Sequence, residues 1–337
     1  MHLGTTSPSK LYNTCVKPAF LHDHDGRTTP VTDLASLLAT PIFIPIPEAR
    51  FSSVLNSSPF IPIPQNLNLR TISSPNLPPN TIFRSGTLSH LPAASLATLK
   101  DKYNITTIFD LRGSHETARS PSVQIEGIET VWIATDRDFL FQGHGENTPG
   151  AEEDEFGKPA HRDHVKPIEF TTNDGEDGYV KLYTNFLHTH KKPYKAVFER
   201  LRDGRGGVLI HCTAGKDRTG ILAALILALM DAPAEEIATD YALTRIGIEP
   251  FREYLLAALL KQMGKTESIE AFEDPGMAEL CGVRGQTILV VLEWMGRKWG
   301  SGGNGKYPGV EGYLIQELGL EAADVEKIRR NLAAGGV

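Results

Sequence analysis

The sequence predicts an α/β fold with a mostly parallel central sheet flanked by helices and a helical C-terminal third. Three observations favour this fold class. From about residue 58, short β-branched runs alternate with segments of helical periodicity, which is typical of strand–helix–strand units. The run Ile221–Met230 is apolar on every side and about half as long as a membrane-spanning helix, which predicts a buried core helix. Beyond residue 234 the patterns are helical only.

Each expected strand is a short run rich in β-branched or aromatic residues. The strands are expected at Thr81–Gly86, Thr106–Leu111, Glu129–Thr135 and Gly207–His211. The helices are expected at Leu91–Lys100, Tyr179–Arg202, Thr219–Met230, Ala234–Leu243, Pro250–Gln262, Gly285–Arg297, Val310–Leu318 and Ala322–Ala333. The glycine-rich stretch 300–309 predicts a flexible connection inside the helical third.

Residues 1–57 are expected to form a peripheral, partly irregular extension before a main domain at 58–335. A Thr-Asp pair can cap a short amphipathic helix at Asp33–Thr40. The pentapeptide FIPIP occurs at Phe43–Pro47 and again at Phe60–Pro64. Because proline lacks a backbone N–H donor, each copy is limited to an edge strand or a polyproline segment. A proline-rich ligand for a partner domain would usually carry P-x-x-P with a basic residue, which is lacking here.

The acidity of the chain is concentrated in one segment. Residues 136–178 hold twelve Asp and Glu against four Lys and Arg, a local net charge of −8, so the rest of the chain is close to +1. The segment is also rich in Gly, Pro and Asn, which predicts a long surface loop inserted in the domain, either a lid or a disordered insertion. Its histidines His144, His161 and His164 lack regular ligand spacing, so no metal site is predicted.

Composition excludes several classes of protein. The 337 residues carry 34 basic and 41 acidic side chains, a net charge of −7, which argues against a general nucleic-acid binder. Three cysteines without a C-x-x-C pair do not make a disulfide framework and favour a reducing compartment. The N-terminal residues lack the charged start and apolar core of a secretory signal. We therefore expect a soluble, cytoplasmic protein without a membrane span; its oligomeric state stays open.

The motif that carries chemistry is HCTAGKDRTG at His211–Gly220, between a short apolar strand and the apolar helix. A loop between a strand and a helix N-terminus directs several backbone N–H groups into one concavity, where the helix dipole adds positive potential. The same groups favour the thiolate form of Cys212 at the start of the loop. Arg218, where the helix begins, can fork onto two phosphate oxygens. This arrangement predicts phosphoryl transfer through a cysteinyl-phosphate.

The motif does not match two other kinds of binding site that contain similar residues. A nucleotide-binding phosphate loop ending at Gly215-Lys216 would need Ser or Thr where the chain has Asp217, and Gly where it has Ile210. A zinc site would need a second cysteine near Cys212, and none is there.

This loop resembles that of the cysteine-dependent protein tyrosine phosphatase superfamily. Together with Ile82–Leu91, Thr106–Glu116 and Tyr307–Leu320, it is similar to the tyrosine/serine-type phosphatases of bacteria, fungi and plants, a group that includes a mycobacterial secreted lipid phosphatase. The resemblance spans about residues 58–335 and implies a metal-independent phosphatase without a cofactor. The acidic insertion departs from the family pattern, so no lid function of the family is carried onto it.

The resemblance implies a role for each residue of the loop. Cys212 is the expected nucleophile and Arg218 the phosphate clamp, and His211 is expected to hydrogen-bond the backbone around the thiolate. The hydroxyl of Thr219 either assists the departing sulfur or serves as an ordinary helix-start side chain. The side chains and backbone N–H groups expected to bind the phosphate are those of His211, Thr213, Ala214, Gly215, Lys216 and Thr219. Lys216 resembles the lysine of phosphoinositide phosphatases, which implies multiply phosphorylated substrates; simple charge enrichment of an anion site is the alternative.

The general acid is expected to be an aspartate, and two candidates stay open. Asp217 resembles the acid proposed for the lipid-phosphatase group, although its neighbours Lys216 and Arg218 favour the ionised carboxylate. Asp136 follows the expected strand Glu129–Thr135, where related phosphatases place a mobile acid loop. The lower-ranked candidates are Asp138, Asp174 and Asp177. The residues expected to brace the loop from behind are Asp110, Arg112, Arg84 and Ser85.

The predicted function is therefore a phosphomonoester hydrolase acting on phosphotyrosine or phosphoserine proteins or on phosphoinositides. Two alternatives stay open: a phosphatase of a small phosphorylated metabolite, and a phosphate-binding module without turnover. An accessible thiolate at Cys212 is expected to be oxidised by peroxide. Whether Cys15 or Cys281 pairs with it depends on distances that a sequence does not give.

Overall fold

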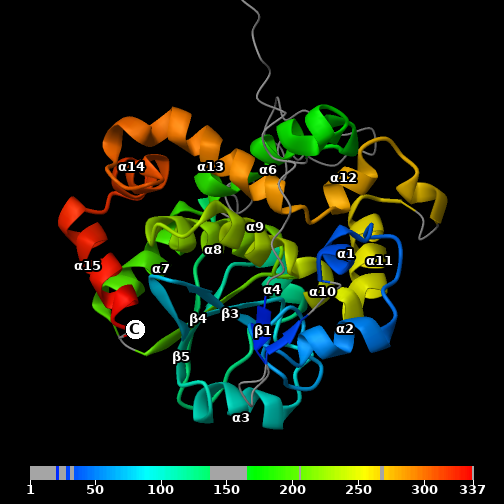
Figure 1. Cartoon of the computed structure of the whole chain (residues 1–337), viewed down its shortest axis with the longest axis horizontal. Helices are drawn as coiled ribbons and strands as arrows, with labels where there is room; N and C mark the ends of the chain where they lie inside the picture. The colour runs from blue at the N-terminus through cyan, green and yellow to red at the C-terminus, as the bar shows by residue number, and fades with distance from the viewer. Residues whose placement is uncertain are drawn as a thin grey trace, which may run out of the picture.

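A five-stranded sheet forms the centre of the molecule, with helices packed on both of its faces (Figure 1). This arrangement confirms the predicted α/β fold class with a helical C-terminal third. The computed structural model describes residues 20–22, 28–30, 34–136, 165–204, 206–265 and 269–335.

The sheet has the strand order β3-β4-β7-β5-β6. The strand bounds are β3 (Arg70–Ser74), β4 (Leu77–Ser85), β5 (Ile105–Asp110), β6 (Glu129–Trp132) and β7 (Gly207–His211). β4, β7, β5 and β6 are parallel, whereas β3 runs antiparallel to β4. Ser85 and Asp110 both pair with His211, so the segments that follow β4, β5 and β7 leave the sheet at the same edge.

The central strand β7 sends alternate side chains to opposite faces of the sheet, as a strand must. Val208 and Ile210 join the core that contains the C-terminal helices, whereas Leu209 joins the core on the other face. Because both faces are covered, β7 is buried throughout, and Val208–Ile210 form a continuous hydrophobic run before His211.

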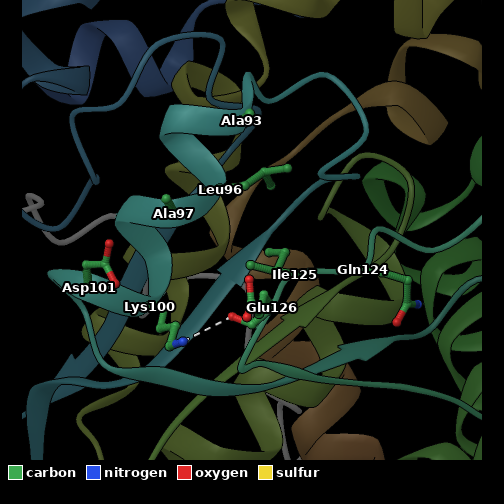
Figure 2. A pocket seen from close by; sticks show the side chains of 8 residues that line it. All are labelled: Ala93, Leu96, Ala97, Lys100, Asp101, Gln124, Ile125 and Glu126. Carbon is green, nitrogen blue, oxygen red and sulfur yellow. Dashed lines mark hydrogen bonds between the residues drawn. The ribbon is translucent and has the colours of Figure 1, made fainter.

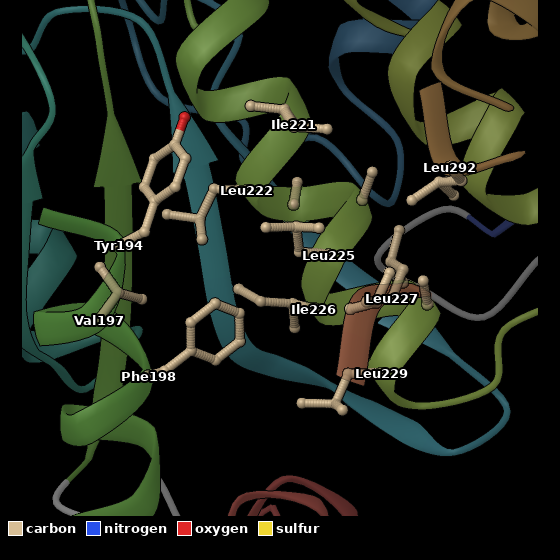
Figure 3. Packing of buried hydrophobic residues seen from close by; sticks show 14 of the residues in the cluster. Tyr194, Val197, Phe198, Ile221, Leu222, Leu225, Ile226, Leu227, Leu229 and Leu292 are labelled. Atoms are coloured by element: carbon tan, nitrogen blue, oxygen red, sulfur yellow. The ribbon is translucent and has the colours of Figure 1, made fainter. Parts of the chain in front are cut away.

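The apolar helix α8 (Asp217–Leu229) follows β7 directly and is buried from Thr219 onward. In Figure 3, Leu222 and Ile226 of α8 face Tyr194 and Phe198 of the neighbouring helix α7. Side chains on every side of α8 are in contact with other elements, which explains its lack of a polar face. Burial on all sides fixes the start of α8, and with it the loop that leads into the helix.

The other predicted helices are present with differences at their ends, and three short helices at residues 114–119, 244–247 and 277–281 were not predicted. Their bounds are α3 (Ala93–Asp101), α4 (Ser114–Arg119), α6 (Glu176–Thr189), α7 (Lys191–Asp203), α9 (Ala234–Ala242), α10 (Thr244–Gly247), α11 (Arg252–Gln262), α12 (Met277–Cys281), α13 (Gly285–Trp299), α14 (Pro308–Gln316) and α15 (Ala322–Ala333). The helix predicted at Tyr179–Arg202 is in fact two helices that break at His190. No helix in the described ranges is long and apolar enough to cross a membrane.

The described part of the N-terminal extension packs on the domain. Helices α1 (Leu34–Ala39) and α2 (Glu48–Leu55) bury apolar side chains against Leu243 and Ile246, beside α10. A small two-stranded sheet, β1 (Phe20–His22) with β2 (Thr28–Pro30), precedes them. Neither FIPIP copy forms a regular strand, although Phe60 makes one isolated bridge to Arg70.

The acidic segment is more helical at its end than the predicted loop. The 3-10 helices η2 (Pro167–Phe170) and η3 (Asn173–Gly175) lead into α6 at Glu176. Phe170 is fully buried, with its ring centroid 5.0 Å from that of Tyr179, and this contact holds the segment against the domain. Residues 137–164 lie outside the described residues, and with them Asp138, His144, His161 and His164.

Candidate active site

The loop 212–216 runs from the end of β7 to the start of α8, and it is held against the end of β4. Cys212 is only 3% exposed. Gly215 has a φ of +69°, and a Cβ at this position would lie 2.4 Å from the carbonyl oxygen of Ser85. Only glycine combines this left-handed backbone with so close an approach, so the middle of the loop is fixed in shape.

Arg218 is oriented by Glu116 of α4, a residue that the sequence analysis did not assign to the site. The guanidinium donates to both carboxylate oxygens of Glu116, at 2.5 and 2.9 Å, and the hydroxyl of Thr213 donates to the same carboxylate. Burial disfavours both charges, but their mutual attraction outweighs it, so the pKa of Glu116 is lowered and that of Arg218 is raised. Both terminal nitrogens donate to Glu116, and Nη2 also lies 3.4 Å from the hydroxyl of Thr213, so the Nε–H is the donor of Arg218 that has no partner among the described residues.

His211 and the Asp110–Arg112 pair lie beside the start of the loop. The Nδ1 atom of His211 is 3.2 Å from the carbonyl oxygen of Cys212, and burial lowers the pKa of this histidine. Arg112 forms a bidentate pair with Asp110, whose carboxylate lies 3.8 Å from Nε2 of His211. The indole of Trp132 donates to the carbonyl of Arg112 at 2.7 Å. β5 and β6 thus position a buried ion pair behind the imidazole.

The ammonium of Lys216 has two hydrogen-bond acceptors and one carboxylate close to it. Its ammonium is 3.1 Å from the hydroxyl of Tyr179, 2.7 Å from the carbonyl oxygen of Leu280 and 3.6 Å from the carboxylate of Asp217. Burial opposes the charge, but Asp217 and other neighbours outweigh it, so the pKa of Lys216 is raised. The side chain is cationic and lies between the loop and α12.

The two candidate acids have different surroundings. Asp217, the first residue of α8, accepts a hydrogen bond of 2.9 Å from the hydroxyl of Tyr183, which itself lies 2.5 Å from the hydroxyl of Tyr241. Burial raises the pKa of both tyrosines, so both hydroxyls stay protonated. Asp136 instead pairs with Lys192 at 2.8 Å, with both side chains about half exposed. The structure therefore places Asp217, and not Asp136, in contact with the loop residue Lys216.

Two further predicted residues have clear positions. Thr219 is fully buried, and its hydroxyl has no hydrogen-bond partner among the described residues. Arg84 donates to the carbonyl oxygen of Gly215 at 2.7 Å and pairs with Asp240. Arg70 pairs with the same aspartate; burial and the charge of Arg84 lower the pKa of Arg70 to about 9.

Two surface hollows lie away from the loop. A groove of about 360 Å³ lies between α3 and the segment 124–126 (Figure 2), where Lys100 donates to the carbonyl of Glu126 at 3.2 Å. A second hollow of about 480 Å³ is lined by Phe51 and residues 249–254. Neither is lined by a residue of the loop, so the site rests on the loop's own groups.

The structure thus places a buried cysteine between the parallel strand β7 and the buried helix α8, with an arginine held by a carboxylate six residues later in the chain. The chain belongs to the tyrosine phosphatase family, whose profile matches residues 67–334. This match confirms the resemblance inferred from the motifs, and it supports phosphatase activity.

The sequence identity to individual relatives is below 30%. A tyrosine-protein phosphatase of Nostoc commune is 29% identical over 161 residues, which cover 48% of this chain and 51% of that protein, so the chain spans about half of that relative's length. The triple specificity protein phosphatase PtpB of Mycobacterium tuberculosis is 27% identical over 275 residues, 75% of this chain and 91% of PtpB. A crystal structure of TpbA of P. aeruginosa in complex with pTyr has 18% identity and a TM-score of 0.28, covering 55% of this chain and 77% of TpbA.

Proposed function

We propose that the protein hydrolyses phosphomonoesters through a covalent intermediate on Cys212. The observation that carries the proposal is the pairing of Glu116 with Arg218, because the carboxylate holds the guanidinium in place beside the loop while the Nε–H has no partner among the described residues and can donate to a phosphate. We assign residues 58–335 to the phosphatase domain. Backbone N–H groups and Arg218 supply the positive environment, so the reaction requires no metal ion and no cofactor.

The proposed reaction has two steps. The Cys212 thiolate attacks phosphorus, the bond from phosphorus to the ester oxygen breaks, and Asp217 gives a proton to the departing oxygen. Water then attacks the phosphocysteine after giving a proton to Asp217, and the phosphorus–sulfur bond breaks to release phosphate and the thiolate. The buried, unpartnered hydroxyl of Thr219 is available to stabilise the sulfur as it leaves.

Asp217 is preferred to Asp136 as the general acid for a positional reason. It directly precedes the phosphate clamp Arg218, and within the part of the chain that the structure describes, Tyr183 and Lys216 both contact its Oδ1. Its second oxygen, Oδ2, is then available for proton transfer. Asp136, in contrast, is held by Lys192 on α7.

The proposed substrates are phosphotyrosine or phosphoserine proteins or phosphoinositides, with a small phosphorylated metabolite as the alternative. The contacts of Lys216 with Tyr179, Leu280 and Asp217 occupy its ammonium, which weakens the argument for a second phosphate bound there. A cytoplasmic location fits the two described cysteines, Cys212 and Cys281, which are free thiols.

The proposal is tested by hydrolysis of para-nitrophenyl phosphate in the presence of EDTA. Acid quenching during turnover should trap phosphate on Cys212, identified by mass spectrometry of the peptide. A release assay across phosphopeptides, phosphoinositides, inositol phosphates and small metabolite phosphates then identifies the substrate class. Saturable binding of one of these ligands without phosphate release would replace the enzyme with a phosphate-binding module.

Exchanging Asp217 for asparagine should affect poor leaving groups far more than good ones. An alkyl phosphate needs a proton on its departing oxygen, so its kcat should fall by about 10²-fold or more. Para-nitrophenolate leaves without being protonated, so the kcat for para-nitrophenyl phosphate should fall much less. The matched variant Asp136→Asn should keep both rates within about twofold. The reverse pattern would assign the acid to Asp136.

Peroxide should inactivate the enzyme and dithiothreitol should restore its activity. Cys281 should not take part in either step as a resolving cysteine. Burial raises the pKa of the Cys281 thiol to about 11, so near pH 7 it is almost entirely protonated and a poor nucleophile toward an oxidised Cys212. The Cys281→Ser variant should therefore lose and regain activity at the wild-type rate. Slower recovery, or failure to recover, in that variant would identify Cys281 as a resolving cysteine.

A further inference from the structure

Two carbonyl groups in the middle of the phosphate loop, those of Ala214 and Gly215, face the same side chain. Asn68, in the segment between Phe60 and β3, donates from Nδ2 to the carbonyl oxygen of Ala214 at 3.0 Å and to that of Gly215 at 3.2 Å. Arg84 donates to the oxygen of Gly215 from the same side. The side chain of Asn68 is fully buried, so water does not compete for these bonds.

Holding these two carbonyls fixes the direction of two N–H groups. A trans peptide is planar, with its C=O and N–H pointing in opposite directions. The N–H groups of Gly215 and Lys216 belong to the peptides whose carbonyls contact Asn68, so they point away from Asn68, into the concavity that receives the anion. An unrestrained peptide could rotate and present a carbonyl oxygen to the phosphate instead.

Asn68 is itself held from two directions. Its backbone N–H donates to the carbonyl oxygen of Gly247 in α10 at 2.9 Å, and its Oδ1 accepts from Arg70. Its φ of +59° is a left-handed conformation that asparagine tolerates better than most residues. A Cβ on Gly247 would lie 2.1 Å from Oδ1 of Asn68, so α10 and Asn68 fit each other closely.

Helix α10 is in turn clamped by residues 40–46 of the N-terminal extension. Arg245, only 1% exposed, donates to the carbonyl oxygens of Thr40 at 2.9 Å and Ile44 at 2.7 Å, and it pairs with Glu249. Glu249 accepts the backbone N–H of Ile46 at 2.7 Å. A buried ion pair thus binds this stretch through its backbone, in a part of the chain that precedes the match to the family profile.

We propose that Asn68 is a positioning residue that orients the phosphate loop, and that residues 40–46 support it through α10. The extension would then be an integral part of the active centre. The proposal rests on the proposed function only in taking the loop to bind phosphate, so its test measures binding of inorganic phosphate by calorimetry, without turnover.

The first arm compares Asn68→Gly with Asn66→Ala. Glycine adopts the left-handed conformation without strain and removes only the side chain. Asn66 is a matched control: it is a buried asparagine whose side chain, among the described residues, hydrogen-bonds to the backbone of Ile61 and Leu69. Asn68→Gly should raise the Kd for phosphate by about tenfold. Asn66→Ala should keep this Kd within about twofold of the wild-type value, although the two variants have similar Tm values. Equal affinities in the two variants would overturn the proposal.

Asn68→Asp provides a second variant of nearly the same shape. It keeps an acceptor for Arg70 but turns an acceptor oxygen toward the carbonyls of Ala214 and Gly215, so it should bind phosphate at least as weakly as Asn68→Gly. Wild-type affinity in this folded variant would also overturn the proposal. Failure of the wild-type protein to bind phosphate would instead overturn the proposed function, and with it this inference.

The second arm tests the extension with Arg245→Lys. Lysine keeps the charge opposite Glu249 but cannot reach several backbone carbonyls at once. Hydrogen exchange at residues 40–46 should become faster, and phosphate binding should weaken by about threefold. Faster exchange with unchanged phosphate affinity would show that the extension does not support the loop.

Discussion

Replacing Cys212 with serine should lower kcat on para-nitrophenyl phosphate by at least about 10⁴-fold, while phosphate binding and folding are retained. A serine hydroxyl is not ionised near neutral pH and is a far weaker nucleophile than a cysteine thiolate. The attacking group is then lost without loss of the groups that bind the anion. Steady-state kinetics with EDTA, phosphate calorimetry and a thermal melt measure the three properties together.

Cys281→Ser is the matched control for this exchange. Cys281 is also a buried free cysteine, 6% exposed against 3% for Cys212, and it lies outside the loop. The control should keep kcat within about twofold of wild type. Residual activity of Cys212→Ser above a few per cent of wild type, after contaminating phosphatase is excluded, would contradict the assignment of the nucleophile.

Much of the fold was predictable because its elements carry strong local patterns. The buried strand β7 and helix α8 are apolar runs of different length, and α15 begins and ends where the sequence predicts. β3 was missed because Arg70–Ser74 lacks a recognisable strand pattern. Its buried arginine is satisfied by Asp240, 170 residues away, and no local pattern reveals such a partner.

The residues of the candidate site that belong to one short motif could be predicted from the sequence. Those contributed by distant segments of the chain could not. Cys212 and Arg218 could be named because spacing in the loop determines their chemistry. Asn68 contacts the loop from 146 residues away, so its role depends on how the chain folds. Glu116 is the last residue of Thr106–Glu116, one of the segments that carry the family resemblance. A carboxylate there was a possible partner for the buried charge of Arg218, and this signal could have identified it.

Exchanging Arg218 for lysine should lower kcat/KM by about 10³-fold, the second largest effect expected at the site. Lysine keeps a positive charge but cannot hydrogen-bond Glu116 and a phosphate at the same time.

Glu116→Gln should have a smaller effect, mainly on kcat. The weaker pair no longer fixes the guanidinium, so kcat should fall by about 10- to 100-fold. Loss of a negative charge beside the anion should leave KM unchanged or lower.

The double variant Arg218→Lys/Glu116→Gln tests whether Glu116 acts through Arg218. If it does, removing Glu116 costs little once the arginine is gone, so the double variant should be no more than about twofold slower than Arg218→Lys alone. Glu311→Gln is the matched control, because Glu311 is another buried glutamate paired with an arginine, Arg329 at 3.1 Å. It should lower Tm without changing kcat or KM. Additive losses in the double variant, or a raised KM with unchanged kcat in Glu116→Gln, would show that Glu116 does not position the phosphate clamp.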